Sequence, residues 1–356
     1  MVEVRPESAV EVVDELLRRA HVAGASDIHL DPEADGVVVS MRCDGVLEAV
    51  DRLPASLGPR VVGRFKALAD LLAYRSDLPQ EGRIGADRTP LGIEARVATY
   101  PTVAGERVAV RLEVSGSDVA SLESLGLPEI ALRGVCGALD QPEGVVLLTG
   151  PSGSGKTSTL YAAIARIASR TPRRAVLTVE DPVERRIAGV AQTEVRPAAG
   201  LTFARALRSL LRQDPDVILV GEIRDRETAS VVLEAGLTGH LVASTVHAGT
   251  AALVFARLLD LGVEPFVLTS AVRGVLAQRL LRRSDGEGGY AGRVLVAEWL
   301  PVGEELRRAV LNRGDATAVA DAGREAGAVT LREAAADLVR RGLTTEEEVD
   351  RVLGVV

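Results

Sequence analysis

The sequence has few cysteines, histidines and aromatic residues. Only two of its 356 residues are cysteines, Cys43 and Cys136, and they stand far apart. Cysteines so placed form neither a metal-ligand spacing nor a disulfide framework, so we expect no zinc and a reducing compartment. Aromatic residues make up 3% of the chain, which leaves few rings on which nucleic-acid bases could stack.

The chain also lacks an excess of positive charge and any long apolar run. Its formal net charge is −8, which argues against bulk attraction to nucleic acid or to anionic lipid. No apolar run reaches the roughly 18–20 residues that span a bilayer, and the first residues do not form a signal peptide. We therefore expect a cytoplasmic protein without nucleic acid as a partner, which contacts a membrane only through other proteins.

What the sequence does contain is a phosphate-binding loop. The run Gly150–Thr157 fits the pattern G-x-x-x-x-G-K-[ST], after an apolar stretch at 145–149 and before a predicted helix at 158–168. Backbone amides of such a loop point at phosphate oxygens, and the helix N-terminus adds partial positive charge. We expect Lys156 to reach the β- and γ-phosphates and Thr157 to hold Mg²⁺. The predicted ATP-binding residues are Gly150, Pro151, Ser152, Gly153, Ser154, Gly155, Lys156, Thr157 and Ser158.

A change of pattern near residue 115 predicts two domains of α/β class. Residues 1–115 mix short helices and strands, as in a small regulatory domain. Residues 119–356 repeat strand-loop-helix units, which predicts a parallel sheet with helices on its faces. The expected strands of that sheet are 145–149, 175–179, 217–220 and 241–245.

Two further segments complete the predicted organisation. Ser115–Asp118 is a plausible linker because it contains serine and glycine. The chain ends in a helical tail at 331–341 and 346–353, with Thr345 and Glu348 as an expected capping box for the second helix.

Acidic residues follow two of the expected strands, at the edge where ligands of parallel sheets gather. Glu180, Asp181 and Glu184 follow strand 175–179, and one of them could polarise an attacking water. Glu222 follows strand 217–220, where enzymes with a phosphate-binding loop place the acid that holds Mg²⁺, usually through water. An acidic turn or a structural ion pair is the alternative reading of each group.

Two of the four histidines, His240 and His247, flank the expected strand 241–245. An extended strand separates them by about 23 Å, so they cannot share one metal. His247 lies at the carboxyl end and can face the γ-phosphate as a sensor. His240 lies at the amino end, where packing or an interface role is the expectation.

These motifs, in this order, resemble the secretion and pilus ATPase superfamily, which comprises the type II secretion and type IV pilus assembly motors. The likeness covers nearly the whole chain. It implies a PAS-like regulatory domain followed by a RecA-like ATPase domain. The matching strings are Gly150–Thr157, Thr178–Glu184, Arg212–Asp225 and Thr238–Ala248, with Ala25–His29, Arg42–Gly45, Pro79–Arg83 and Gly105–Arg107 in the first domain.

The resemblance also implies roles for particular residues. Glu184 matches the glutamate thought to activate water, and Glu222 matches the metal-linked glutamate. Family members form hexameric rings, in which arginines from the first domain, here Arg83 and Arg96, reach the γ-phosphate of a neighbouring subunit. The motor would act on an inner-membrane platform protein and would lie peripherally at that membrane through its partners.

The chain departs from the family pattern in two places. The zinc-binding cysteines that assembly motors carry after the segment matching Gln278–Arg283 are absent, because Ser284–Tyr290 contains none. The additional N-terminal domain of secretion motors is also missing, which suggests a different docking mode or a truncated chain. The competing functions are a pilus retraction motor, a RecA-like DNA-handling motor and a nucleotide-gated regulatory subunit.

Overall fold

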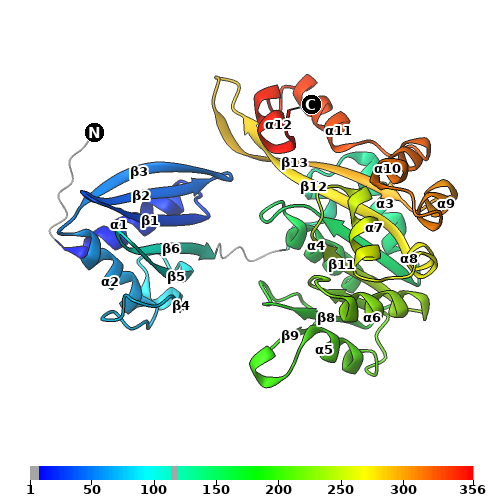
Figure 1. Cartoon of the computed structure of the whole chain (residues 1–356), viewed down its shortest axis with the longest axis horizontal. Coiled ribbons are helices and arrows are strands. Elements are labelled where there is room, and N and C mark those ends of the chain that lie inside the picture. Colours follow the sequence, from blue (N-terminus) through cyan, green and yellow to red (C-terminus); the bar gives the residue numbers. More distant parts are fainter. Residues whose placement is uncertain (1–7, 114–118, 356) are drawn as a thin grey trace. The chain divides into compact units, whose positions relative to one another are not determined.

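The computed structural model describes residues 8–113 and 119–355. The chain divides into two compact units, Met1–Ser117 and Asp118–Val356 (Figure 1). The predicted linker 115–118 lies outside the described residues. In the part of the chain that is described, no helix combines the length and the apolar character needed to cross a bilayer.

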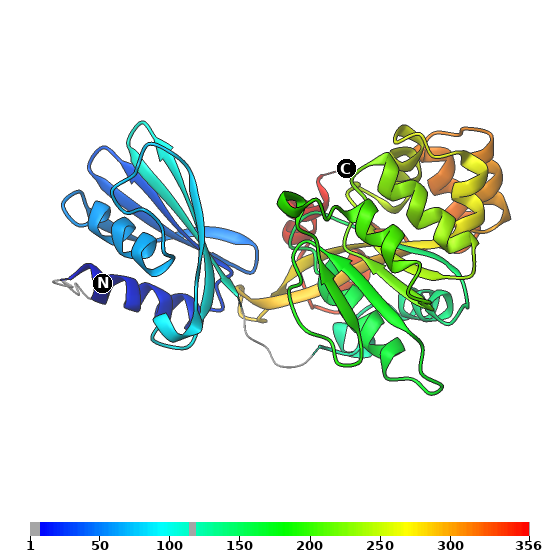
Figure 2. The ribbon, with the colours of Figure 1, turned by 90° about the horizontal axis from the view of Figure 1, so that it is seen from below.

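The N-terminal unit is a six-stranded antiparallel sheet with two helices on one face (Figure 2). Its elements are α1 (Ala9–Val22), α2 (Gly58–Leu68), β1 (Asp27–Glu33), β2 (Gly36–Cys43), β3 (Val46–Pro54), β4 (Gln80–Ile84), β5 (Glu94–Thr102) and β6 (Gly105–Glu113). The strands lie in the order β3-β2-β1-β6-β5-β4.

Alternation along each strand decides which side chains face the helices. Ile28 and Leu30 are fully buried against a core that includes Leu17 of α1 and Phe65 of α2. The residue between them, His29, points to the opposite face. Neither α1 nor α2 covers that face (Figure 2), so polar side chains can stand there in mid-strand.

The C-terminal unit is a seven-stranded sheet in the order β13-β12-β7-β11-β10-β8-β9, parallel except for β13. Its strands are β7 (Gly144–Thr149), β8 (Val176–Glu180), β9 (Ala191–Glu194), β10 (Val217–Val220), β11 (Leu241–Val246), β12 (Val272–Ser284) and β13 (Tyr290–Pro301). Its helices are α3 (Glu129–Leu139), α4 (Lys156–Ala168), α5 (Phe203–Leu210), α6 (Arg226–Leu237), α7 (Ala251–Asp260), α8 (Pro265–Ala271), α9 (Glu304–Leu311), α10 (Ala316–Glu325), α11 (Leu331–Arg340) and α12 (Glu346–Leu353).

Both faces of this second sheet are covered. Leu148 packs with α3 and α4 on one face, and its neighbour Leu147 packs with α5 to α8 on the other. A strand buried on both faces must be apolar throughout, which explains the unbroken apolar run of β10. Ligands of parallel sheets bind at the carboxyl ends of the strands, so the ligand site of this unit is expected there.

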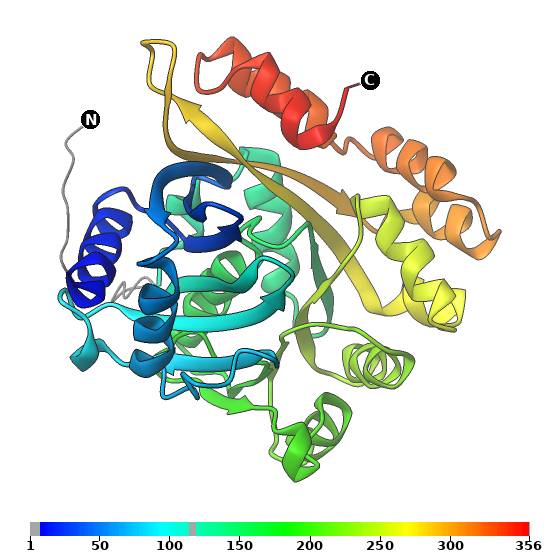
Figure 3. The same ribbon diagram turned by 60° about the vertical axis from the view of Figure 1, so that its left-hand side comes forward.

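The tail helices α11 and α12 pack against the long hairpin of β12 and β13 (Figure 3). The expected capping box of α12 forms only in part. Thr345 Oγ1 accepts from the Glu348 amide at 3.2 Å, but the Glu348 carboxylate turns inward and is fully buried. It accepts from Arg282 Nε at 2.9 Å and Arg351 Nε at 2.7 Å, because burying a carboxylate requires charged partners. The capping prediction was thus wrong for this side chain.

Candidate nucleotide-binding site

The phosphate-binding loop joins β7 to α4 and has the backbone that its glycines permit. Gly150, Gly153 and Gly155 have φ angles of 149°, 76° and 86°, a region that other residues rarely adopt. A Cβ on Gly150 would stand 2.5 Å from both Gln278 O and Ser154 Oγ. The loop can turn this tightly only because Gly150 has no side chain.

Lys156 is folded back onto the loop that it follows. Its Nζ donates to the carbonyl oxygens of Gly150 and Pro151, each at 2.8 Å. Burial, and after it the charge of Arg279, lower the pKa of Lys156, whereas Glu222 acts in the opposite direction. The ammonium group thus lies at the mouth of the loop, where phosphates would replace the carbonyl oxygens as its partners.

Gln278 of β12 holds the loop by a hydrogen bond, a role that the sequence did not reveal. Its Nε2 donates to Ser154 O at 2.7 Å, and the residue is fully buried. Gln278 Oε1 and Ser154 Oγ are buried without a hydrogen-bond partner among the described residues. The loop therefore contains polar groups that a bound ligand or water could satisfy.

Glu222 and His247 lie together at the carboxyl edge of the sheet, because the strands that they follow, β10 and β11, are neighbours. Glu222 follows β10 and its side chain is 15% exposed. It forms an ion pair with Arg224, and its other oxygen lies 3.5 Å from Nε2 of His247, which follows β11. The hydrogen bond from Arg224 to Glu222 raises the pKa of Arg224.

Glu180 is unsuited to act on water because its carboxylate is already engaged. It is 3% exposed and is the last residue of β8. Its oxygens accept from the Tyr161 hydroxyl, from Thr178 Oγ1 at 2.5 Å and from Gln192 Nε2 at 3.1 Å. Burial, reinforced by Glu180, raises the pKa of Tyr161.

Glu184 is held close to this buried group by its backbone. Its amide donates to the Tyr161 hydroxyl oxygen at 3.0 Å, while its side chain is exposed. Of the two glutamates, only Glu184 presents its carboxylate on the surface beyond β8.

His240 takes the structural position that the sequence suggested. Its Nδ1 lies 3.1 Å from the carbonyl oxygen of Ala235 at the end of α6, just before β11 begins. It stands at the opposite end of β11 from His247, so it takes no part in the loop site.

Arg83 and Arg96 stand directly opposite each other on β4 and β5, and Arg96 in turn faces Arg111 on β6. They lie on the face of the N-terminal sheet that is opposite α1 and α2. With Asp27 and His29 they line a hollow of about 470 Å³. The sheet thus places its arginines in one cross-strand row on an open face.

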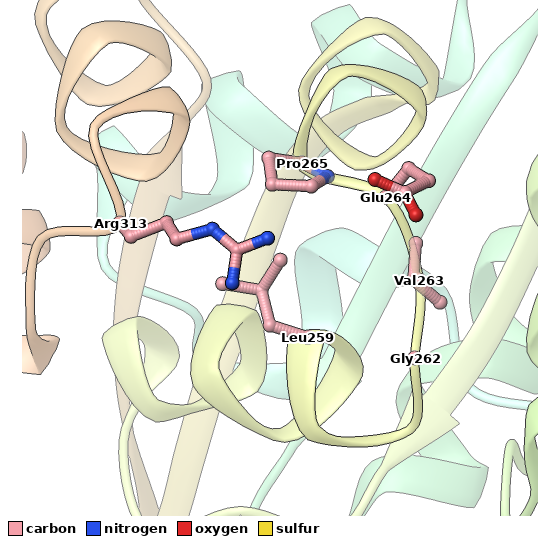
Figure 4. A pocket seen from close by; sticks show the side chains of 6 residues that line it. All are labelled: Leu259, Gly262, Val263, Glu264, Pro265 and Arg313. Atoms are coloured by element: carbon pink, nitrogen blue, oxygen red, sulfur yellow. The ribbon is translucent and has the colours of Figure 1, made fainter.

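A second hollow, of about 310 Å³, lies in the C-terminal unit (Figure 4). Arg313 and Glu264 reach it from the segments after α9 and before α8. None of the predicted site residues lines it. Its lining residues are Leu259, Gly262, Val263, Glu264, Pro265 and Arg313.

The phosphate-binding loop fits a magnesium-bound triphosphate by this geometry. Glycines with positive φ angles precede α4, a helix whose N-terminus attracts anions. Lys156 lies at the mouth of the loop. Thr157, half-buried in the first turn of α4, and Glu222 would hold Mg²⁺, the latter through water. When bound, Mg²⁺ would neutralise charge on the phosphates.

Comparison with known proteins agrees with this geometry. The profile described as "Type II/IV secretion system protein" matches residues 4–351. The chain belongs to this family. Proteins of the family include ATPases, as the resemblance implied.

The type II/IV secretion family supplies close relatives along nearly the full chain. The chain is 42% identical to the type II secretion system protein HxcR of Pseudomonas aeruginosa, over 96% of this chain and 77% of HxcR. It is 39% identical to the type IV pilus assembly ATPase PilB of Thermus thermophilus, over 98% of this chain. It spans only 43% of PilB, so PilB contains much that this chain does not match.

Solved structures of related proteins share the fold. The ATPase DotB of Legionella pneumophila superposes with a TM-score of 0.76 at 24% identity, covering 99% of this chain and 98% of DotB. The pilus retraction motor PilT with bound ADP gives a TM-score of 0.66 at 27% identity, covering 95% and 96%. The expected fold class, α/β with a RecA-like ATPase domain, is confirmed.

Proposed function

We propose that this chain is an ATP-hydrolysing motor that powers the assembly of a type IV pilus, or of the pseudopilus of a type II secretion system. The observation that carries the proposal is the phosphate-binding loop, with Lys156 at its mouth and with Glu222 and His247 at the same sheet edge. The relatives named for pilus assembly and type II secretion match over nearly the whole chain.

Each site residue has a part in the proposed hydrolysis. Lys156 binds the β- and γ-phosphates, and Thr157 and Glu222 hold Mg²⁺. Glu184 accepts the proton of the attacking water, because its residue is exposed beyond β8 whereas Glu180 is buried. His247 contacts the γ-phosphate as a sensor, and it lies beside Glu222. The proposed cofactor is Mg²⁺ alone, without zinc.

We propose further that the chain works as a homo-hexamer. In a ring, head-to-tail contacts would bring Arg83 and Arg96 of one subunit to the phosphates of the next, where late-arriving positive charge stabilises the transferring phosphoryl group. The proposed partner is an inner-membrane platform protein, which would keep a cytoplasmic motor at the membrane.

Pilus retraction is the second candidate. The structural likeness to PilT favours it, at an identity of 27%. The identities of 37–42% to assembly and secretion proteins support the first candidate more strongly. A DNA-handling motor is a third and weaker candidate, because the acidic chain has few aromatic residues.

The test is ATP binding and hydrolysis by the purified chain. We expect magnesium-dependent ATP hydrolysis, and we expect Lys156→Ala to weaken ATP binding by removing a charged partner of the phosphates. Elemental analysis of the same sample should find no stoichiometric zinc. Lys156→Ala protein that binds and hydrolyses ATP like the parent would contradict the proposed site.

A further inference from the structure

Arg279, the residue after Gln278 on β12, is a half-buried cation whose hydrogen bonds go to backbone oxygens. Its Nη1 donates to Gln278 O at 2.9 Å and its Nη2 donates to Gly249 O at 2.5 Å. No carboxylate of the described residues forms an ion pair with it. The guanidinium charge is therefore without a directly bound counter-charge in that part of the chain.

Arg279 lies beside the mouth of the phosphate-binding loop. A Cβ on Gly150 would stand 3.2 Å from Arg279 Nη1, and Lys156 Nζ donates to Gly150 O at 2.8 Å. The two cations thus approach the same loop residue, Lys156 from α4 and Arg279 from β12. The Arg279 charge contributes to lowering the pKa of Lys156, after burial.

Two cations that approach the same loop residue are electrostatically unfavourable without an anion. Burial lowers the pKa of Arg279, and Glu298 is the carboxylate that opposes this shift. Burial also raises the pKa of Glu298. Two partly desolvated like charges repel each other, and a polyanion between them removes both costs.

The chemistry of the guanidinium suits phosphate in particular. Its planar fork of N–H groups matches phosphate oxygens and forms charge-assisted hydrogen bonds. It also carries more N–H groups than its two carbonyl contacts use. Arg279 can therefore bind phosphate while it still holds Gly249, which follows His247 closely in the chain.

We propose that Arg279 is a second polyphosphate-binding cation, supplied by the same chain as the phosphate-binding loop, and that it binds the terminal phosphates of ATP together with Lys156. The inference rests on the proposed function, because it requires that the loop binds ATP. It adds a cation from within the chain to Arg83 and Arg96, which are proposed to act between subunits.

The test compares three variants of the full chain: Arg279→Ala, Arg279→Lys and Arg283→Ala. Arg283 lies further along β12, is exposed and carries the same charge, so Arg283→Ala is a matched control. Calorimetry measures the binding of ATP, ADP and inorganic tripolyphosphate. Thermal unfolding of each variant shows whether the fold is retained.

We expect Arg279→Ala to weaken binding of ATP and of tripolyphosphate by about 10- to 100-fold, the range for one lost charge-assisted bond. ADP, which lacks the γ-phosphate, should lose less. Arg279→Lys should recover much of the affinity because it restores the charge. Arg283→Ala should bind like the parent.

The outcomes separate the two proposals. A parent chain that binds no ATP overturns the proposed function and, with it, this inference. A parent that binds ATP, together with Arg279→Ala that binds it equally well, overturns the inference alone. Arg279→Lys that binds as weakly as Arg279→Ala, with an equally lowered unfolding temperature, would show that Arg279 only fixes Gly249, and this also overturns the inference.

Discussion

The two sheets of this chain place polar side chains in opposite ways. The N-terminal sheet is antiparallel and its helices cover one face, so Arg83, Arg96 and Arg111 stand in mid-strand on the other face. The C-terminal sheet is parallel except for β13 and is covered on both faces, and Glu222 and His247 stand just beyond its strand ends. The number of covered faces thus decides where each unit can offer charge to a ligand.

The difference is consistent with the different tasks that we propose for the two sites. We propose that the row of arginines on the open face acts on phosphates of another subunit. A site at the edge of a covered sheet is assembled within one unit, because its strands are neighbours in the sheet. Four experiments test this contrast between the two sheets, and they are given from the largest expected effect to the smallest.

The largest effect is expected from removing the open-face arginines. The double variant Arg83→Ala/Arg96→Ala should hydrolyse ATP about 10³- to 10⁵-fold more slowly, the range for losing an arginine finger. Its ATP affinity should stay near that of the parent, because the phosphate-binding loop is intact. Steady-state ATPase rates and calorimetric binding give the two quantities.

Mixing this variant with Lys156→Ala protein shows whether the arginines act between subunits. Each protein alone should be nearly inactive. Mixed rings should recover part of the rate, because some interfaces then combine an intact loop with intact arginines. If the two proteins assemble together and no activity returns, the open face does not act on a neighbouring subunit.

A smaller effect is expected from Glu184→Gln at the edge of the covered sheet. Turnover should fall by about 10²- to 10⁴-fold, the range for losing a general base, while ATP binding persists. The matched control is Glu180→Gln, which should lower the melting temperature, since the buried carboxylate accepts several hydrogen bonds. A parental rate in Glu184→Gln would assign water activation to another residue.

The smallest effect concerns stability and compares strand residues of the two sheets. Ile218 of β10 is fully buried, whereas Leu47 of β3 is 41% exposed. Ile218→Ala should lower the free energy of unfolding by about 2–5 kcal/mol, and Leu47→Ala by about 0.5 kcal/mol or less. Urea unfolding measures both, and equal losses would contradict the contrast between a covered and an open face.

Local pattern determined much of this protein. The glycines and lysine of the phosphate-binding loop, the apolar strand Val217–Val220 and the tail helix Glu346–Leu353 all have the bounds or the geometry that the sequence predicted. Each depends on residues close together in the chain, since glycine permits positive φ and periodicity marks a buried face. The predicted ends of strands 217–220 and 241–245 also located the sheet edge at which Glu222 and His247 lie.

Tertiary structure alone decided the surroundings of those residues. Strand β12 went unpredicted because arginines interrupt its apolar pattern, yet it lies beside β7 and brings Gln278 and Arg279 to the loop. Likewise, Glu348 was expected to cap its own helix and instead binds Arg282 inside the fold. Strand order and packing bring together residues that are far apart in the chain, so local periodicity and spacing do not predict those contacts.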